Sequence, residues 1–326
     1  MARKLRLEYP GACYHVINRG NYRQDVFATA GARAAFETCL FEACAKSGWL
    51  LHAFVVMSNH YHLAVETPEG NLVAGMQWLQ ATFANRFNRL RDERGHLFQG
   101  RYKSLLVEPG EALGQVCHYI HLNPVRAGLV TMPRLKEYPN GSYWYGRRPA
   151  SRPACLRVES ALAAAGGLAD TVAGWRAYEA YLTWHAEQGP AGRNAAYVTL
   201  NRGWALGTED FKARLVHEHG VVALSRAWET AGAKEVRQMR WTEECKRCMQ
   251  ALDKTDTDLQ QERKSAPWKV AIAAHLKTTT QASNRWLSER LQMGSAVAVS
   301  QYVGQLRRAE GDGRQWLERL TEILKT

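Results

Sequence analysis

The chain has 326 residues, 46% of them hydrophobic and 23% charged, which excludes a wholly disordered protein and leaves room for about two domains. Lysine and arginine number 43 against 31 aspartate and glutamate, and the net charge of +12 points to a polyanionic partner such as nucleic acid. A basic enzyme without such a partner fits the charge equally well. No apolar run approaches the roughly 18 residues of a membrane span, no apolar stretch follows the basic amino terminus, and the seven cysteines are scattered. We therefore expect a cytoplasmic protein with no membrane partner.

The first 140 residues alternate between strand and helix patterns. Strands are predicted at residues 13–18, 50–56, 60–66 and 102–107. A first helix is predicted from a Thr29 cap to about Lys46, before Gly48. A second helix is predicted from Asn71 to Gly95. The β-α-β-β-α-β order is typical of a ferredoxin-like α+β fold, in which an antiparallel sheet carries helices on one face and leaves the other face free.

Two histidines open the third predicted strand. Because side chains alternate across a strand, His60 and His62 project from one face and Tyr61 projects from the other. Two imidazoles side by side suit a divalent metal ion. Histidines with a purely structural role fit the same pattern, so the pair alone leaves both interpretations open.

A helix predicted from Pro109 to Asn123 carries a second polar group. Tyr119 and Asn123 are four residues apart, so their side chains can reach one point together. The tyrosine offers a nucleophile, and the amide oxygen of Asn123 could complete a metal site with the two imidazoles. His118 and His121 flank the tyrosine but point elsewhere on a helix, so neither is assigned as its base. A half-buried tyrosine and a capping asparagine are the alternative interpretation.

Four segments in this order resemble the single-tyrosine HUH transposases, and most of all the branch of REP-associated tyrosine transposases. They are residues 14–21 (YHVINRGN), 56–63 (VMSNHYHL), 98–104 (FQGRYKS) and 119–128 (YIHLNPVRAG). The resemblance covers about residues 5–135 and implies the HUH nuclease fold.

The resemblance also implies the roles of individual residues. In that family the two HUH histidines bind a divalent metal ion, which corresponds to His60 and His62 here. The family tyrosine is the nucleophile, which corresponds to Tyr119, and the polar residue four positions later completes the metal site, which corresponds to Asn123. Relatives from mobile elements often have glutamine at the position of Asn123, so the third ligand departs from that pattern.

The implied function is that of a transposase-type DNA endonuclease and strand transferase. It would cleave single-stranded, REP-like hairpin DNA through a 5′-phosphotyrosine intermediate, with Mg²⁺ or Mn²⁺ and without ATP. The resemblance implies a monomer or homodimer that is associated with the nucleoid of a bacterium. A catalytically inactive or domesticated DNA-binding regulator on the same fold is the alternative function.

Basic residues beside these motifs are candidate DNA contacts. Arg19 and Arg23 follow the first predicted strand, and Arg101 and Lys103 lie near the fourth. Contacts from such residues to phosphates supply affinity and salt sensitivity but no sequence preference. Solvated surface charges are the alternative for each residue.

The remainder of the chain is predicted to be an all-α carboxy-terminal extension. Helices at 268–276, 284–291 and 296–308, with a short glycine-containing turn between the last two, have the spacing of a helix-turn-helix. This stretch weakly resembles initiator-type modules of bacterial replication proteins, and an ordinary three-helix bundle is the alternative. In the first interpretation Ser295, Ser300 and Gln301 would face duplex DNA.

These patterns predict three domains. Residues 1–140 form an HUH single-tyrosine transposase domain, and a stretch rich in Pro, Gly and Ser follows it. Residues 141–255 form a linker and helical region, and residues 256–326 form a helix-turn-helix-like DNA-binding domain.

Overall fold

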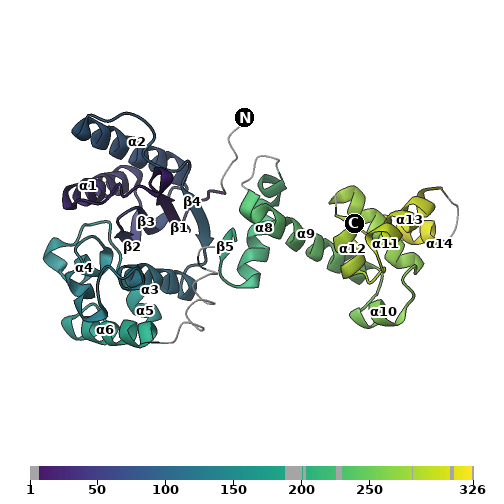
Figure 1. The fold of residues 1–326 in the computed structure, drawn as a ribbon. Helices are drawn as coiled ribbons and strands as arrows, with labels where there is room; N and C mark the ends of the chain where they lie inside the picture. Colours follow the sequence, from purple (N-terminus) through teal and green to yellow (C-terminus); the bar gives the residue numbers. More distant parts are fainter. Residues whose placement is uncertain are drawn as a thin grey trace. The chain divides into compact units, whose positions relative to one another are not determined.

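The computed structural model describes residues 7–187, 200, 203–224, 230–280, 282–308 and 312–324 (Figure 1). The chain divides into two compact units, and the division falls between Lys212 and Ala213. The domains 1–140, 141–255 and 256–326 are a different division of the chain and stay a prediction. Over the described ranges, no helix has both the length and the apolar character needed to cross a membrane.

Four antiparallel strands form the sheet of the first unit, in the order β2-β3-β1-β4. They are β1 (Ala12–Arg19), β2 (Leu50–Val56), β3 (His60–Thr67) and β4 (Lys103–Val107). Their order and the helices between them confirm the ferredoxin-like α+β fold. A fifth strand, β5 (Ala205–Leu206), pairs with β4 in parallel. No sequence pattern indicated β5, because two residues are too few to show a periodicity.

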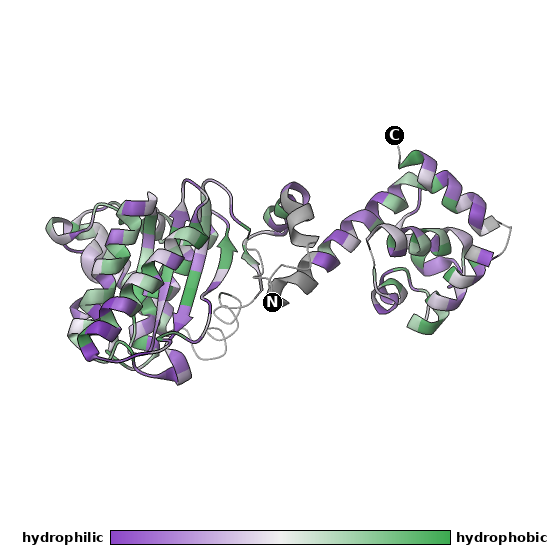
Figure 2. Cartoon of the chain, turned by 90° about the horizontal axis from the view of Figure 1, so that it is seen from above, coloured by the Kyte–Doolittle hydropathy of each residue, from purple (hydrophilic) through white to green (hydrophobic). Residues whose placement is uncertain are grey.

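Helices α1 (Ala30–Ser47) and α2 (Leu72–Arg91) cover one face of this sheet (Figure 1). Tyr61 projects from β3 into this layer, where its ring centroid lies 4.6 Å from that of Phe36. The ring of Phe36 in turn lies 5.2 Å from that of Phe83 on α2. These fully buried rings join the sheet to both helices. Hydrophobic residues, green in Figure 2, lie along the strands of the sheet.

The ends of α1 confirm the sequence prediction, whereas α2 ends early. The Thr29 hydroxyl accepts a hydrogen bond from the amide of Ala32 at 3.1 Å, and Gly48 closes α1 with a φ of 67°. Helix α2 stops before Gly95, because Asp92 already takes the left-handed conformation with a φ of 51°.

Helix α3 (Glu111–Arg126) packs against β2 and β3 from the opposite side of the sheet (Figure 1). The prediction that this second face stays free is therefore wrong. The physical reason is the apolar stripe of α3, which consists of Leu113, Val116 and Ile120. All three side chains are buried, and α3 packs against β2 and β3 of the sheet.

Helix α3 also runs past its predicted end at Asn123. Pro124 lies inside the helix, which reaches Arg126. Proline lacks an amide hydrogen, so one bond of the helical ladder is lost. The amide of Ala127 still donates to the Asn123 carbonyl at 2.9 Å, and this bond closes the last turn.

The chain after α3 adds further helices that contact β2 and α3. They are α4 (Ser142–Gly146), α5 (Glu159–Ala164) and α6 (Val172–Glu187). Short 3₁₀ helices occur before α1 at η1 (Asn21–Arg23), and after α3 at η2 (Met132–Glu137) and η3 (Pro149–Ser151). The residues 142–187 thus pack on the same unit as the predicted transposase domain.

A buried chain of hydrogen bonds joins α3 to α4, α6 and β2. The Ser142 hydroxyl donates to the Phe54 carbonyl at 3.1 Å and accepts from His121 Nε2 at 2.8 Å. The other nitrogen of His121 accepts from the Tyr178 hydroxyl at 2.8 Å, and the Tyr178 oxygen accepts from His118 Nδ1 at 2.8 Å. His121 is neutral in this arrangement, because one of its nitrogens donates and the other accepts, and burial lowers the pKa of both histidines to about 3.

The second unit is all-helical over its described residues, as predicted. Its helices are α9 (Thr230–Ala251), α10 (Asp256–Gln261), α11 (Pro267–Thr279), α12 (Asn284–Arg290), α13 (Ala296–Arg308) and α14 (Asp312–Ile323), and α8 (Glu209–Leu224) spans the division between the units. Cys245 and Cys248 are buried in its core beside Trp268 and Leu287, so both cysteines are core residues.

The two helices of the predicted helix-turn-helix begin where the sequence predicts. The Ser283 hydroxyl accepts from the amide of Trp286 at 3.3 Å and caps α12. Gly294 forms the turn with a φ of 88°, and the Ser295 hydroxyl accepts from the amide of Ala298 at 3.2 Å at the start of α13.

Candidate active site

Two histidines of β3 and a tyrosine of α3 meet on the face of the sheet that α3 covers. The ring centroids of His60 and His62 lie 5.1 Å apart, and that of Tyr119 lies 5.5 Å from His62. Tyr61, between the two histidines, points into the α1 and α2 layer on the other face. Strand alternation and the packing of α3 thus bring three of the predicted site residues together.

An arginine lies against the tyrosine ring. The guanidinium carbon of Arg126 is 4.9 Å from the ring centroid of Tyr119, a distance typical of a cation–π contact. The two residues are seven positions apart on α3, so they share one face of the helix. The sequence analysis did not single out Arg126, although it lies in the fourth motif. Its charge makes the surroundings of Tyr119 favourable for an anion.

His15 is the site residue that the sequence analysis missed. It lies on β1, is fully buried, and places its Nε2 3.0 Å from His62 Nδ1. Its Nδ1 lies 2.9 Å from the backbone carbonyl oxygen of Leu200. The ring also lies edge-on to Tyr119, with centroids 5.7 Å apart. The signal that could have found it is the antiparallel register of β1 and β3, which pairs His15 with Ala64 on the histidine face.

These contacts fix which nitrogen of each histidine carries the proton. The Leu200 carbonyl can only accept, so His15 Nδ1 donates and its Nε2 is an acceptor. His62 Nδ1 therefore donates to His15, which leaves the lone pair of His62 on Nε2. His60 Nδ1 donates to the side-chain oxygen of Asn59 at 2.7 Å, which leaves its lone pair on Nε2 as well. Both β3 histidines thus offer Nε2 as a ligand atom.

Burial, together with neighbouring charged groups, keeps the imidazoles of His15, His60 and His62 neutral. Burial lowers the pKa of His15 to about 4, and burial together with the charge of Arg19 lowers the pKa of His60 to about 4. The pKa of His62 is held well below its ordinary value, first by burial and then by the neighbouring His15 and His60. Neutral imidazole is the form that binds a metal ion.

Asn123 follows Tyr119 by one turn of α3 and is buried. Its side-chain nitrogen Nδ2 has no hydrogen-bond partner, which is costly for a buried donor. A rotation of the amide by a half turn exchanges this nitrogen for the oxygen, an atom that can bind a cation. Two imidazole nitrogens and an amide oxygen form a donor set that suits a divalent transition metal.

The predicted DNA contacts of the first unit differ in their exposure to solvent. Arg19 lies directly opposite His60 in the register of β1 and β3, and its side chain is exposed. Arg23 is exposed on the turn after β1. At the start of β4, Arg101 is exposed and Lys103 is half-buried.

The three DNA contacts predicted for the carboxy-terminal helices belong to the second unit. Ser295 precedes α13, and Ser300 and Gln301 lie within it. All three residues are exposed. Their contact with duplex DNA stays a prediction.

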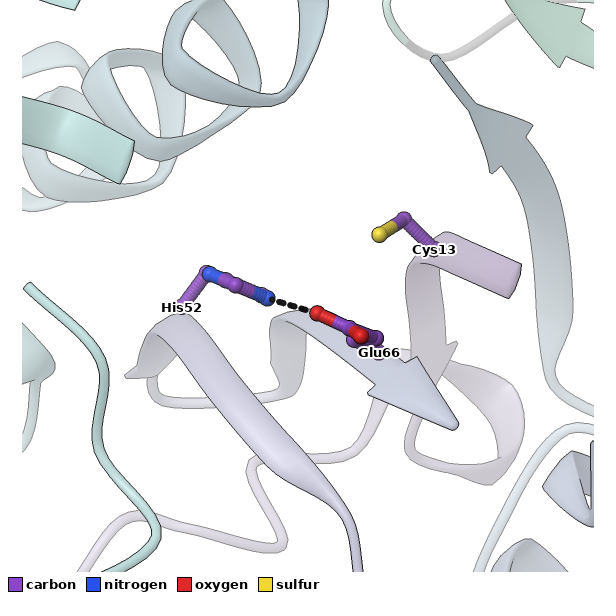
Figure 3. A group of neighbouring side chains, drawn as sticks. All are labelled: Cys13, His52 and Glu66. Atoms are coloured by element: carbon purple, nitrogen blue, oxygen red, sulfur yellow. Dashed lines mark hydrogen bonds and ion pairs between the residues drawn. The ribbon is translucent and has the colours of Figure 1, made fainter. Parts of the chain in front are cut away.

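A separate cluster of three polar side chains lies on β1, β2 and β3 (Figure 3). The donor atoms of Cys13, His52 and Glu66 all lie within 4.8 Å of one another, which one cation could bridge. His52 is the extra residue of a bulge in β2, which turns its side chain toward Glu66. Its Nε2 lies 3.2 Å from a Glu66 oxygen and its Nδ1 lies 2.8 Å from the Ser160 hydroxyl, so hydrogen bonds already satisfy both nitrogens.

Comparison with known proteins bears on this arrangement. Residues 9–123 match the family model described as "Transposase IS200 like". This range includes His60, His62, Tyr119 and Asn123, so the predicted resemblance to a transposase is confirmed for this part of the chain. No curated protein gives a significant match. A solved structure of a REP-associated tyrosine transposase bound to a REP hairpin is similar at 16% identity and a TM-score of 0.38, covering 47% of this chain and 89% of that one.

Proposed function

We propose that the protein is a transposase-type DNA endonuclease and strand transferase that cleaves single-stranded hairpin DNA through a 5′-phosphotyrosine intermediate. The observation that carries this proposal is the contact of Tyr119 with His62, whose ring lies beside that of His60, inside the range that matches the transposase family. A nucleophile beside two side chains that can bind a metal ion is an arrangement suited to phosphoryl transfer.

The residues that would hold a divalent metal ion are His60, His62 and Asn123. Support comes from the two unprotonated Nε2 atoms and from the buried amide of Asn123 that lacks a partner. When bound, Mg²⁺ or Mn²⁺ would polarise the scissile phosphate and orient it. Mg²⁺ prefers oxygen ligands, so two imidazoles favour Mn²⁺.

The chemical step that we propose is a transesterification at phosphorus. The Tyr119 oxygen forms a bond to phosphorus while the bond from phosphorus to the 3′ oxygen breaks. The tyrosine proton is released, and the leaving oxygen takes up a proton and becomes a free 3′-OH. The number of phosphate ester bonds is unchanged, so a second 3′-OH can reverse the step and join strands without ATP.

The surrounding side chains support this role for Tyr119. Arg126 holds the ring from one face and offers a positive charge to the phosphate. His118 and His121 point away from the site into the bonds with Tyr178 and Ser142, so neither acts as the base. The exposed arginines beside β1 provide charge for the phosphates of the strand.

The proposal is tested with a labelled hairpin oligonucleotide and Mn²⁺. The wild-type protein is expected to give a cleaved strand and an adduct that survives denaturation. Tyr119→Phe is expected to lose both, because it keeps the ring contacts but has no hydroxyl. A Tyr119→Phe protein that still forms the adduct would refute the nucleophile. A wild-type protein that binds the hairpin without cleaving it would instead support the alternative, a DNA-binding regulator on this fold.

A further inference from the structure

Tyr22 lies on the turn that follows β1, which we call the β1 turn (residues 20–24). Its side chain is 86% exposed, the highest value for a large apolar side chain among the described residues. Tyr22 has a φ of 49° and Arg23 a φ of 61°, so two consecutive residues with side chains take the left-handed conformation. Such residues rarely adopt it, because Cβ then approaches the following carbonyl oxygen.

The β1 turn is firmly held despite this exposure. The amide of Gly20 donates to the Asn59 carbonyl at 2.8 Å, and the amide of Asn21 donates to the Leu97 carbonyl at 2.9 Å. A Cβ on Gly20 would lie 2.4 Å from the Gln24 carbonyl oxygen, so the turn requires glycine there. The exposed ring is therefore carried on a fixed backbone and is presented to solvent in an ordered place.

The β1 turn is attached to the candidate active site. Asn59 accepts from His60 through its side-chain oxygen and from Gly20 through its carbonyl, so one residue supports both. Tyr22 lies three positions after Arg19, which is paired with His60 in the register of β1 and β3. The Cα atoms of Tyr22 and Arg19 therefore lie within roughly 11 Å of each other.

We propose that the Tyr22 ring is a stacking platform for one unpaired base of the DNA strand that enters the site. An exposed aromatic face flanked by cations is the combination that binds single strands, since bases stack on the ring while arginines contact phosphates. Arg19 and Arg23, both exposed, provide those cations on either side of Tyr22. This inference rests on the proposed function, and it adds the class of ligand that the β1 turn binds.

The test compares Tyr22→Ala with Tyr22→Phe in the full chain, in a Tyr119→Phe background so that no strand is cut. Affinity is measured by fluorescence anisotropy for a hairpin with single-stranded tails and for a fully paired duplex. Tyr22→Ala is expected to weaken binding to the tailed hairpin by about 5- to 150-fold. Tyr22→Phe is expected to bind within about twofold of its parent, since stacking needs the ring and not the hydroxyl. Duplex binding is expected to stay unchanged in both.

Each other outcome has a defined meaning. Equal binding of Tyr22→Ala and its parent overturns the inference, and so does an equal loss in Tyr22→Phe, which would indicate a hydrogen bond from the hydroxyl. A loss that extends to the duplex also overturns it, because paired bases cannot stack on Tyr22. If the parent itself shows no preference for the tailed hairpin, then the proposed function fails as well. The first outcome leaves the proposed function intact, so the two failures can be told apart.

A second readout locates the base. A fluorescent 2-aminopurine is placed at successive positions of the tail, and its emission is expected to be quenched at the one position that stacks on Tyr22. Tyr22→Ala is expected to restore emission at that position, and Tyr22→Phe is expected to leave it quenched. Quenching that is the same in all three proteins would contradict stacking on this ring.

Discussion

His15 offers a quantitative test of how the site is organised, because it touches His62 and would not touch a metal ion itself. We predict that His15→Leu weakens the binding of Mn²⁺ to the protein without DNA. The leucine removes the acceptor that lies 3.0 Å from His62 Nδ1 and leaves a buried donor without a partner. The Nε2 of His62 is then no longer fixed as the unprotonated atom.

The expected size follows from two independent magnitudes. Removing the hydrogen-bond partner of a ligating histidine typically costs about 10- to 100-fold in metal affinity, or about 1.4–2.8 kcal/mol. Leaving one buried donor unsatisfied costs about 1–3 kcal/mol. The two ranges are of the same order.

The assay is a titration with Mn²⁺ followed by calorimetry or by the electron paramagnetic resonance of the free ion. His15→Gln is the matched control, since its side-chain oxygen can accept from His62 in place of Nε2. We expect His15→Gln to recover most of the affinity that His15→Leu loses. Equal affinity of His15→Leu and wild type would refute the proposed support of His62, as would equal losses in both variants.

Three further predictions concern acid, packing and metal removal. Burial lowers the pKa of His118 to about 3, whereas a histidine in an unfolded chain has a pKa of about 6.5. The stability that neutral His118 contributes is therefore complete above pH 6.5 and is lost as the pH falls toward 3. At pH 5 the loss amounts to about 2 kcal/mol. His118→Asn should flatten the dependence of the unfolding free energy on pH. A Cβ on Gly114 would lie 2.1 Å from the Ala164 Cβ, so Gly114→Ala should destabilise the first unit by about 1–3 kcal/mol in urea unfolding, and Ala164→Gly should relieve the clash. EDTA should abolish hairpin cleavage and added Mn²⁺ should restore it, whereas cleavage in EDTA would exclude the metal.

Local patterns in the sequence were sufficient for the four main strands and for the start of α1 in the first unit. Alternation along β3 placed His60 and His62 on one face, and the Thr29 cap and Gly48 stop located α1. The four-residue step from Tyr119 to Asn123 put both on one face of α3. Each of these features depends on residues close together in the chain, where periodicity and capping carry the information.

Features that depend on distant residues were missed. The role of His15 requires the register of β1 and β3, and also the Leu200 carbonyl, which lies 185 positions away in the chain. The expectation of a free sheet face failed because the stripe of α3 could only be matched to its surface in three dimensions. Similarly, the bulge that turns His52 toward Glu66 leaves no sign in a short apolar strand.

The measurement that tests the central claim most directly is to locate the covalent bond in the adduct. Trypsin would release residues 104–126 as one peptide, and Tyr119 is its only tyrosine. After reaction with hairpin DNA and Mn²⁺ and digestion with a nuclease, mass spectrometry should find this peptide with the mass of a nucleotide phosphate on Tyr119. A nucleotide on any other residue, or hairpin cleavage that leaves no peptide modified, would contradict the account.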